Sequence, residues 1–361
     1  MPEVWLQDFE KSTAAALEWV ERSIKVTGYK GSAGYFHLWL GWSPAYPETT
    51  GYLIETLFDY ANYLEEEKYK NLAIACADWL CSIQRPDGAF PGGLGETGEP
   101  VVFDTGQILF GLIAAWRRTV EAKYKTALER AVIWLLENLE PDGSWKKYSY
   151  VFGYIPAYYT RVVWAVLAAN EILQQVEVTD KMRKAIEYYA AQVQPNGAVK
   201  NWAFAHDELA YTHTIAYTLR GFLECGALLN DQQLLTKARF IGDRIVELYK
   251  IHQKIAGRYD ENWRGDYGFE CVTGNAQLAI AFARLYQLSG DENYFNIAKK
   301  IFSKTVHYQK LMPLLNLYGA IPGSAPIWGA YQRFSFPNWA AKFYLDAFLI
   351  LKKLEDERAS A

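Results

Sequence analysis

The sequence is short of the residues that build disulfide frameworks, metal clusters and membrane spans. Its 361 residues include only four cysteines, with no Cys-x-x-Cys pair, and only five histidines. This cysteine usage excludes a disulfide-stapled scaffold and is typical of a reducing compartment. No segment approaches the roughly 18 consecutive apolar residues that cross a bilayer, and the N-terminus has no basic segment followed by an apolar one. We therefore expect a cytoplasmic protein without a membrane span.

Positive charge is also in short supply. Lys and Arg together number 37 against 41 Asp and Glu, which gives a net charge of -4 and a pI near 5.9. Proteins that bind a phosphate backbone normally carry a basic excess, so we expect no nucleic-acid partner. Hydrophobic residues make up 51% of the chain and charged residues 22%, which is close to the globular average and excludes a disordered or fibrous chain.

Aromatic residues are, in contrast, abundant. The chain contains 13 Trp, 26 Tyr and 18 Phe. A core built mainly from Leu, Ile and Val would not require so many rings. The excess predicts a site lined with aromatic side chains.

The chain contains an internal repeat of helical pairs. Apolar residues at i, i+3, i+4 and i+7 predict amphipathic first helices over 6–24, 69–83, 124–139, 181–193, 234–249 and 294–307. More apolar second helices start at a recurring position, 52 to 65 residues apart: Thr50, Thr105, Thr160, Thr212, Thr273 and Asn338. These residue types favour helix N-caps. Turn motifs follow three of the first helices: Pro86-Asp87-Gly88, Pro141-Asp142-Gly143 and Pro195-Asn196-Gly197.

Six helical hairpins can form either a closed ring or an open solenoid. An open solenoid needs polar caps at both ends, whereas the last predicted inner segment, 343–351, is strongly apolar. A closed ring lets every hairpin bury its apolar face against its neighbours. We therefore predict an all-α fold, an (α/α)6 toroid of six hairpins with the more apolar helices inside, formed by a single domain over 1–361.

The repeat and its Pro-Asp-Gly-x-aromatic loops resemble the (α/α)6 toroid superfamily. This superfamily includes terpenoid cyclases, protein prenyltransferase β-subunits and many carbohydrate-active lyases, hydrolases and epimerases. The resemblance covers nearly the whole chain, but its motifs identify the scaffold rather than the chemistry. In such a ring the inner helices begin at one mouth, where free N–H groups and helix dipoles favour anionic ligands.

Residues beside the inner-helix starts are the candidates for catalysis. The proposed catalytic set is Glu48, Asp104, Tyr159, Tyr211 and His213. In a lyase or C5-epimerase, Tyr211 or Tyr159 would act with His213 to exchange the proton α to a uronate carboxyl. In a hydrolase, Asp104 and Glu48 would be the acid/base pair. Each candidate has a structural alternative: Asp104 as a helix cap, His213 as a hydrogen-bonded core residue, and the tyrosines as packing.

The predicted ligand is an acidic, uronate-containing saccharide. Aromatic rings suit the apolar faces of a pyranose, while Arg161 and Arg264 would hold a carboxylate. The segment 319–331 predicts a structured loop over the mouth. The remaining predicted substrate-binding residues are Trp42, Trp145, Trp202, Trp263, Trp328, Tyr331 and Asn338.

Two other function classes stay open. In class II terpene cyclases the resemblance implies an Asp-x-Asp-Asp-Thr motif, but Phe103 stands here where the protonating Asp is expected, before Asp104 and Thr105. In prenyltransferases it implies zinc held by Asp, Cys and His; Cys271 and His213 occur in the reverse order, so we predict no metal and no cofactor. A noncatalytic sugar-binding module is the third class.

Overall fold

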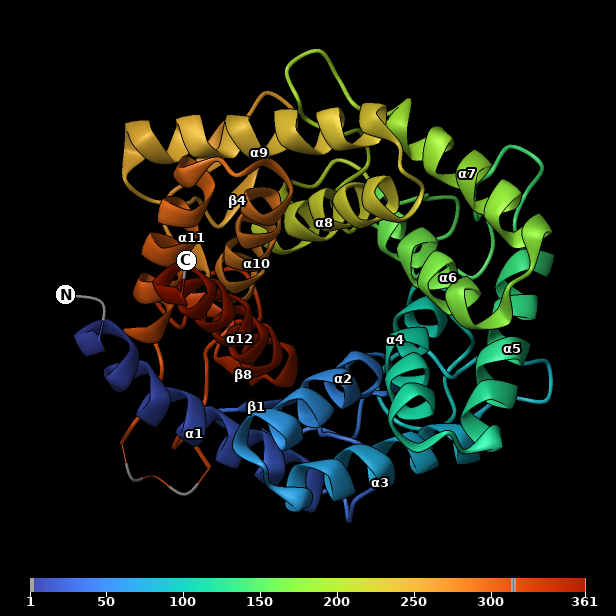
Figure 1. The fold of residues 1–361 in the computed structure, drawn as a ribbon, viewed down its shortest axis with the longest axis horizontal. Coiled ribbons are helices and arrows are strands. Elements are labelled where there is room, and N and C mark those ends of the chain that lie inside the picture. Colours follow the sequence, from blue (N-terminus) through green and yellow to red (C-terminus); the bar gives the residue numbers. More distant parts are fainter. Residues whose placement is uncertain (1–2, 313, 315, 361) are drawn as a thin grey trace.

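The computed structural model describes residues 3–312, 314 and 316–360, which form two concentric layers of α-helices (Figure 1). The outer helices are α1 (Glu3–Lys25), α3 (Glu67–Ile83), α5 (Ala122–Glu137), α7 (Val176–Ala190), α9 (Gln232–His252) and α11 (Glu292–Val306). The inner helices are α2 (Pro47–Leu64), α4 (Val102–Thr119), α6 (Thr160–Leu173), α8 (Thr212–Leu228), α10 (Val272–Ser289) and α12 (Asn338–Ser360). The predicted all-α toroid of six hairpins is confirmed.

The ring is closed between the two ends of the chain. Successive inner helices pack side by side, and α12 packs against α2 (Figure 1). The Tyr60 hydroxyl of α2 donates to the Leu345 carbonyl of α12 at 2.9 Å. Near the mouth, β1 (Tyr35–His37) pairs antiparallel with β8 (Ser335–Pro337) and with β2 (Gly41–Trp42). These contacts exclude the open solenoid.

Burial separates the two layers as the hydrophobic pattern predicts. In the inner helix α10, every residue from Val272 to Ala283 is buried. The outer helix α9 buries residues at helical spacing, such as Leu234, Ala238 and Ile241, and exposes its charged face. An inner helix contacts neighbours on both sides and an outer helix behind it, so nearly all of its surface is removed from water.

The five recurring threonines do not cap their helices, so that prediction is wrong. The N-caps of α2 and α4 are Tyr46 and Val101, and neither makes a side-chain capping bond. The Thr105 hydroxyl lies one turn inside α4 and accepts from the backbone N–H of Phe90 at 3.2 Å. The Thr50 hydroxyl accepts in the same way from the N–H of Ser32, at 3.0 Å. At these two positions the threonine fastens the incoming loop to its inner helix.

Short strands order the remaining loops. One sheet contains β3 (Ala210–Tyr211), β4 (Arg258–Tyr259) and β5 (Gly265–Asp266), and a second pairs β6 (Glu270–Cys271) with β7 (Ser324–Ala325). A 3-10 turn, η1 (Ala157–Tyr159), leads into α6. Because β7 lies within 319–331, that segment is a structured loop, as predicted. Among the described residues, no helix has the length and apolar character needed to cross a membrane.

Candidate active site

A cavity of about 160 Å³ lies at the mouth of the toroid, where the inner helices begin. Most of its wall is aromatic, and the charged side chain that lines it is that of Glu48. The full lining is Tyr46, Glu48, Thr49, Tyr52, Phe103, Tyr150, Tyr158, Phe204, His213, Tyr217, Tyr331, Gln332 and Trp339. A small cavity with ring walls and convergent polar groups has the character of a ligand site.

Glu48 lies in the first turn of α2, directly after Pro47, and only 6% of it is exposed. Burial, and to a smaller extent the negative charge of Asp104, raise the pKa of its carboxyl from 4.5 to about 8. Hydrogen bonds with Tyr46 and Tyr52 oppose this shift but do not cancel it. Glu48 therefore holds a proton near neutral pH.

Asp104 lies in the first turn of α4 and is fully buried. Its Oδ2 accepts hydrogen bonds from the Tyr150 hydroxyl at 2.7 Å and from the Gly93 N–H at 2.9 Å. Its Oδ1 is buried without a partner among the described residues. Burial raises the pKa to about 7, and the two donated hydrogen bonds hold the increase below that of Glu48. Since the N-cap of α4 is Val101, the helix-cap alternative for Asp104 is wrong.

Two tyrosine hydroxyls connect the carboxyl groups. The Tyr150 and Tyr46 hydroxyls are 3.0 Å apart, and Tyr46 in turn hydrogen-bonds with Glu48. With Glu48 protonated, every donor can point along one chain, from Glu48 through Tyr46 and Tyr150 to the Asp104 carboxylate. Reversing all the donors moves the proton to Asp104. The pair thus shares one proton through hydroxyl groups that can each donate and accept.

His213, in the first turn of α8, faces the same cavity as a neutral imidazole. Its Nδ1 lies 2.8 Å from Oε1 of Gln277, and because an amide oxygen only accepts, this contact assigns the proton to Nδ1. Nε2 then keeps its lone pair. Burial lowers the pKa of His213 to about 3. The rings of Tyr217 and Tyr331 lie 4.3 and 5.1 Å from the imidazole, between centroids.

Asp104 lies behind the cavity wall, where it bonds to Tyr150, and the other residues proposed for proton or carboxylate chemistry do not line the mouth cavity. Tyr159 is buried against Trp145, and the Tyr211 hydroxyl points to the Ala330 carbonyl, 3.4 Å away. Arg264 is exposed in the turn between β4 and β5. Arg161 is buried beneath the cavity, with its guanidinium carbon 4.8 Å from the centre of the Tyr217 ring.

The structure also separates the substrate-binding candidates. Tyr331 lines the cavity, and its hydroxyl accepts from the Trp339 indole at 2.8 Å. Trp328 is 62% exposed in the loop beside it. The remaining candidates make their contacts within the protein. The Trp42 ring packs against Trp19, and the Trp202 ring packs against Trp263. The Trp145 indole donates a hydrogen bond to the Leu135 carbonyl, and the Asn338 amide donates one to the Ser32 hydroxyl.

Several cavity residues had no place in the sequence-based prediction. Tyr52 and Tyr217 follow Glu48 and His213 by four residues, so helical spacing puts each tyrosine on the same face as its partner. That signal could have identified them. Tyr150 lies in a loop, 46 residues from the carboxylate that it contacts, and no local pattern marks it.

The described residues contain no group of three or more His, Cys, Asp or Glu side chains placed to hold a metal ion. Cys271, considered beside His213, is buried, and burial raises the pKa of its thiol to about 12. The thiol is therefore protonated at neutral pH.

Comparison with solved structures identifies the same architecture in carbohydrate-active enzymes. An unsaturated glucuronyl hydrolase specific for heparin superposes with a TM-score of 0.77 at 17% identity, covering 98% of each chain. The glycosaminoglycan-degrading unsaturated glucuronyl hydrolase from Bacillus sp. GL1 gives 0.76 at 13% identity, covering 95% of this chain and 97% of that one. Cellobiose 2-epimerase from Spirochaeta thermophila gives 0.75 at 12% identity, covering 98% of each chain.

No protein-family model matches the chain, and no curated protein sequence matches it either. At the identities of these solved structures, the likeness shows a shared (α/α)6 toroid fold.

Proposed function

We propose that this protein is a glycan-active enzyme that hydrolyses an acidic, uronate-containing saccharide at the mouth cavity. The observation that carries the proposal is the pair of buried carboxyl groups, Glu48 and Asp104, linked by the hydroxyls of Tyr46 and Tyr150. The raised pKa of both groups allows one to act as an acid while the other acts as a base near neutral pH. The aromatic wall suits the apolar faces of a pyranose.

In the proposed reaction, Glu48 donates its proton to the oxygen of the leaving sugar as the glycosidic C–O bond breaks. Water attacks the anomeric carbon, and Asp104 accepts the proton that the water loses. Because Asp104 lies behind the cavity wall and Tyr150 lines it, the water passes its proton to the Tyr150 hydroxyl while that hydroxyl passes its own proton to Oδ2 of Asp104. Concerted transfer through Tyr150 and Tyr46 then returns the proton to Glu48, so the site ends each cycle as it began.

The acidic character of the substrate is supported by the solved structures named as glucuronyl hydrolases. Arg161 and Arg264 lie outside the cavity lining, so they are not the groups that would meet a uronate carboxylate first. We assign that role to the Gln332 amide and the tyrosine hydroxyls of the wall.

Epimerase or lyase chemistry is the second candidate, favoured by the state of His213. Its imidazole is neutral and its Nε2 lone pair is free to accept a carbon-bound proton. A cellobiose 2-epimerase has the same fold. Product analysis separates the two: hydrolysis shortens the saccharide by adding water, whereas epimerisation preserves its mass and elimination leaves a double bond.

A thermal-shift panel tests the substrate class. It compares uronate-containing oligosaccharides, neutral oligosaccharides and prenyl diphosphates on the Glu48→Gln protein, which cannot turn them over. A ligand at a hundredfold its dissociation constant stabilises by about 2.7 kcal/mol. Stabilisation by the uronates supports the proposal. Stabilisation by prenyl diphosphates alone overturns it in favour of an isoprenoid enzyme, and uronate binding without turnover by the unaltered protein identifies a sugar-binding module.

A further inference from the structure

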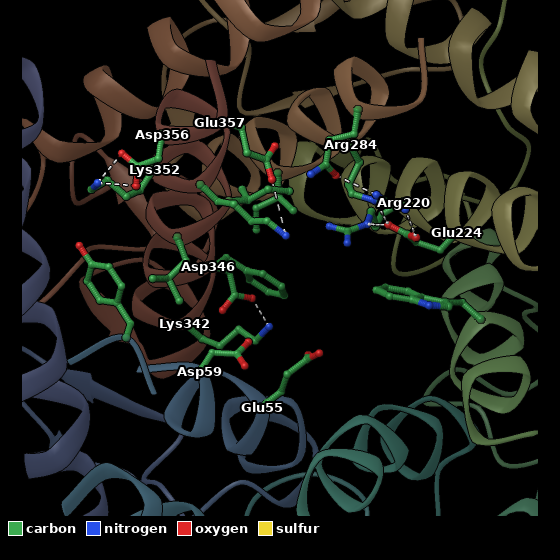
Figure 2. A pocket seen from close by; sticks show the side chains of 18 of the residues that line it. Glu55, Asp59, Arg220, Glu224, Arg284, Lys342, Asp346, Lys352, Asp356 and Glu357 are labelled. Carbon is green, nitrogen blue, oxygen red and sulfur yellow. Dashed lines mark hydrogen bonds and ion pairs between the residues drawn. The ribbon is translucent and has the colours of Figure 1, made fainter. Parts of the chain in front are cut away.

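A second and much larger cavity, of about 1210 Å³, opens at the other end of the toroid, where the inner helices end (Figure 2). Side chains from the later turns of α2, α8 and α10 and from the length of α12 line it, with Trp164 from α6. None of its lining residues belongs to the mouth cavity. It is therefore a separate space on the same ring.

The charges around this far-end cavity balance. Its lining contains six acidic and six basic side chains, and most are paired within the wall (Figure 2). Glu224 binds both Arg220 and Arg284, while Lys342 binds Asp346. A wall with no formal net charge attracts neither anions nor cations over a distance. The cavity therefore favours a neutral ligand.

Two charged groups nevertheless face the cavity with hydrogen-bonding capacity that the protein leaves unused. Glu55 is exposed to it and makes no hydrogen bond or ion pair within the described part of the chain. In Figure 2 its carboxyl group points into open space, across from Arg220. Arg161 is only 4% exposed, and its bond to Gln107 uses Nε alone. Its two terminal nitrogens lie among aromatic rings and have no protein acceptor among the described residues.

Apolar surface completes the wall. Trp164 is partly exposed. The guanidinium groups of Arg161 and Arg220 lie over its ring, with their central carbons 5.0 and 5.1 Å from the ring centre. Leu349 and Ile350 of α12 are also only partly buried. A ligand that satisfies this wall needs an apolar face together with hydroxyl groups that can both donate to Glu55 and accept from Arg161.

We propose that the far-end cavity is a second carbohydrate-binding site that takes a neutral oligosaccharide. A pyranose has the required apolar C–H face, and its hydroxyls can donate to a carboxylate and accept from a guanidinium at the same time. The cavity volume is sufficient for several sugar residues. This site is independent of catalysis at the mouth.

The test is a calorimetric titration with cellotetraose, maltotetraose and xylotetraose, with tetragalacturonate and spermidine as charged comparators. All titrations use the Glu48→Gln background, so that turnover at the mouth does not contribute. We expect a neutral tetrasaccharide to bind, and Glu55→Ala to weaken it by about tenfold or more because a hydrogen bond to a charged group is lost. Trp164→Leu should also weaken it. Glu129→Ala, an exposed glutamate on α5, is the matched control and should leave the affinity unchanged.

Three results would overturn the inference: no neutral tetrasaccharide binds, a charged comparator binds more tightly than all of them at a site that Glu55→Ala weakens, or Glu55→Ala and Trp164→Leu leave the affinity for the neutral sugar unaltered. The last result would place the sugar elsewhere. A negative result for the far-end cavity does not contradict the proposed reaction at the mouth, because turnover by the unaltered protein is measured separately.

Discussion

Glu48 and Asp104 show how burial can make ordinary carboxyl groups useful near neutral pH. Each is surrounded by rings, and desolvation is the largest cause of its raised pKa. Tyr150 and Gly93 then distinguish the two acids by donating to Asp104 alone. The same burial has a cost in stability, because a charged form is disfavoured in the folded state.

The first prediction concerns that cost. The folded pKa of Glu48 lies above its unfolded value of about 4.5, so its contribution to stability is complete below pH 4.5 and is lost as the pH rises through about 8. Glu48→Gln removes the titration. Urea unfolding should find this variant more stable than the unaltered protein by roughly 1–3 kcal/mol at pH 9, with little difference at pH 5. Equal stabilities at pH 9 would show that Glu48 is not desolvated.

The second prediction concerns the hydroxyl chain. Tyr150→Phe removes a hydrogen bond that lowers the pKa of Asp104, so that pKa should rise. The acidic limb of the pH profile of kcat/KM should then move to higher pH by roughly half to one pH unit, with a lower kcat. Tyr148→Phe is the control, since Tyr148 lies in the same loop and packs against Trp134 instead, with the two ring planes tilted by 52°. An unchanged profile with unchanged kcat would exclude a role for the chain.

The candidate site could be predicted only in part from the sequence. Glu48, Asp104 and His213 were found because each lies beside an inner-helix start, and the structure places all three at the mouth cavity or against it. Tyr46 and Tyr150 meet through loop conformations that hydrophobic periodicity does not encode. Tyr159 occupies an equivalent position along its repeat, but its side chain packs into the core.

At the level of helices and loops, the sequence repeat predicted which helices form, and in what order, more accurately than it predicted where each helix begins. The recurring threonines mark the same place in each hairpin, but α2 begins at Pro47 and α4 at Val102, ahead of Thr50 and Thr105. Proline favours the first helical turn, where a missing N–H costs nothing. Because both helices begin ahead of the threonine, the hydroxyls of Thr50 and Thr105 are free to accept from the loop.

The third prediction tests this fastening. Thr105→Val keeps the shape of the side chain but leaves the buried N–H of Phe90 without its acceptor. We expect a loss of about 1–3 kcal/mol in the free energy of unfolding, with an unchanged urea m-value. Thr236→Val, whose hydroxyl lies on the exposed part of α9, should change it by less than about 0.5 kcal/mol. Equal effects at both positions would contradict the fastening role.

For the whole molecule, the sequence predicted that the ring closes. That prediction depended on a single argument, the apolar character of the last inner helix. The structure shows the contacts that close the ring, which the sequence pattern could not predict. The Tyr60 hydroxyl donates a hydrogen bond to the Leu345 carbonyl, and β1 pairs with β8. These join residues almost 300 positions apart, and no local signal in either segment identifies its partner.

The fourth prediction follows from closure. An open solenoid can unfold hairpin by hairpin, whereas a closed ring has no end from which to fray. Urea unfolding followed by far-UV circular dichroism and by tryptophan fluorescence should give coincident transitions. Resolved transitions with stable partial rings would contradict a closed unit.

The central claim is that this toroid hydrolyses a saccharide with Glu48 and Asp104. Its most direct test is to incubate the protein with uronate-containing oligosaccharides in ¹⁸O-labelled water and to measure the masses of the products by mass spectrometry. We predict that the fragment whose anomeric carbon is attacked carries one labelled oxygen and that the leaving fragment carries none, with the rate reduced by about 10²–10⁴-fold in Asp104→Asn. No label in either fragment, or undiminished turnover by Asp104→Asn, would contradict the account.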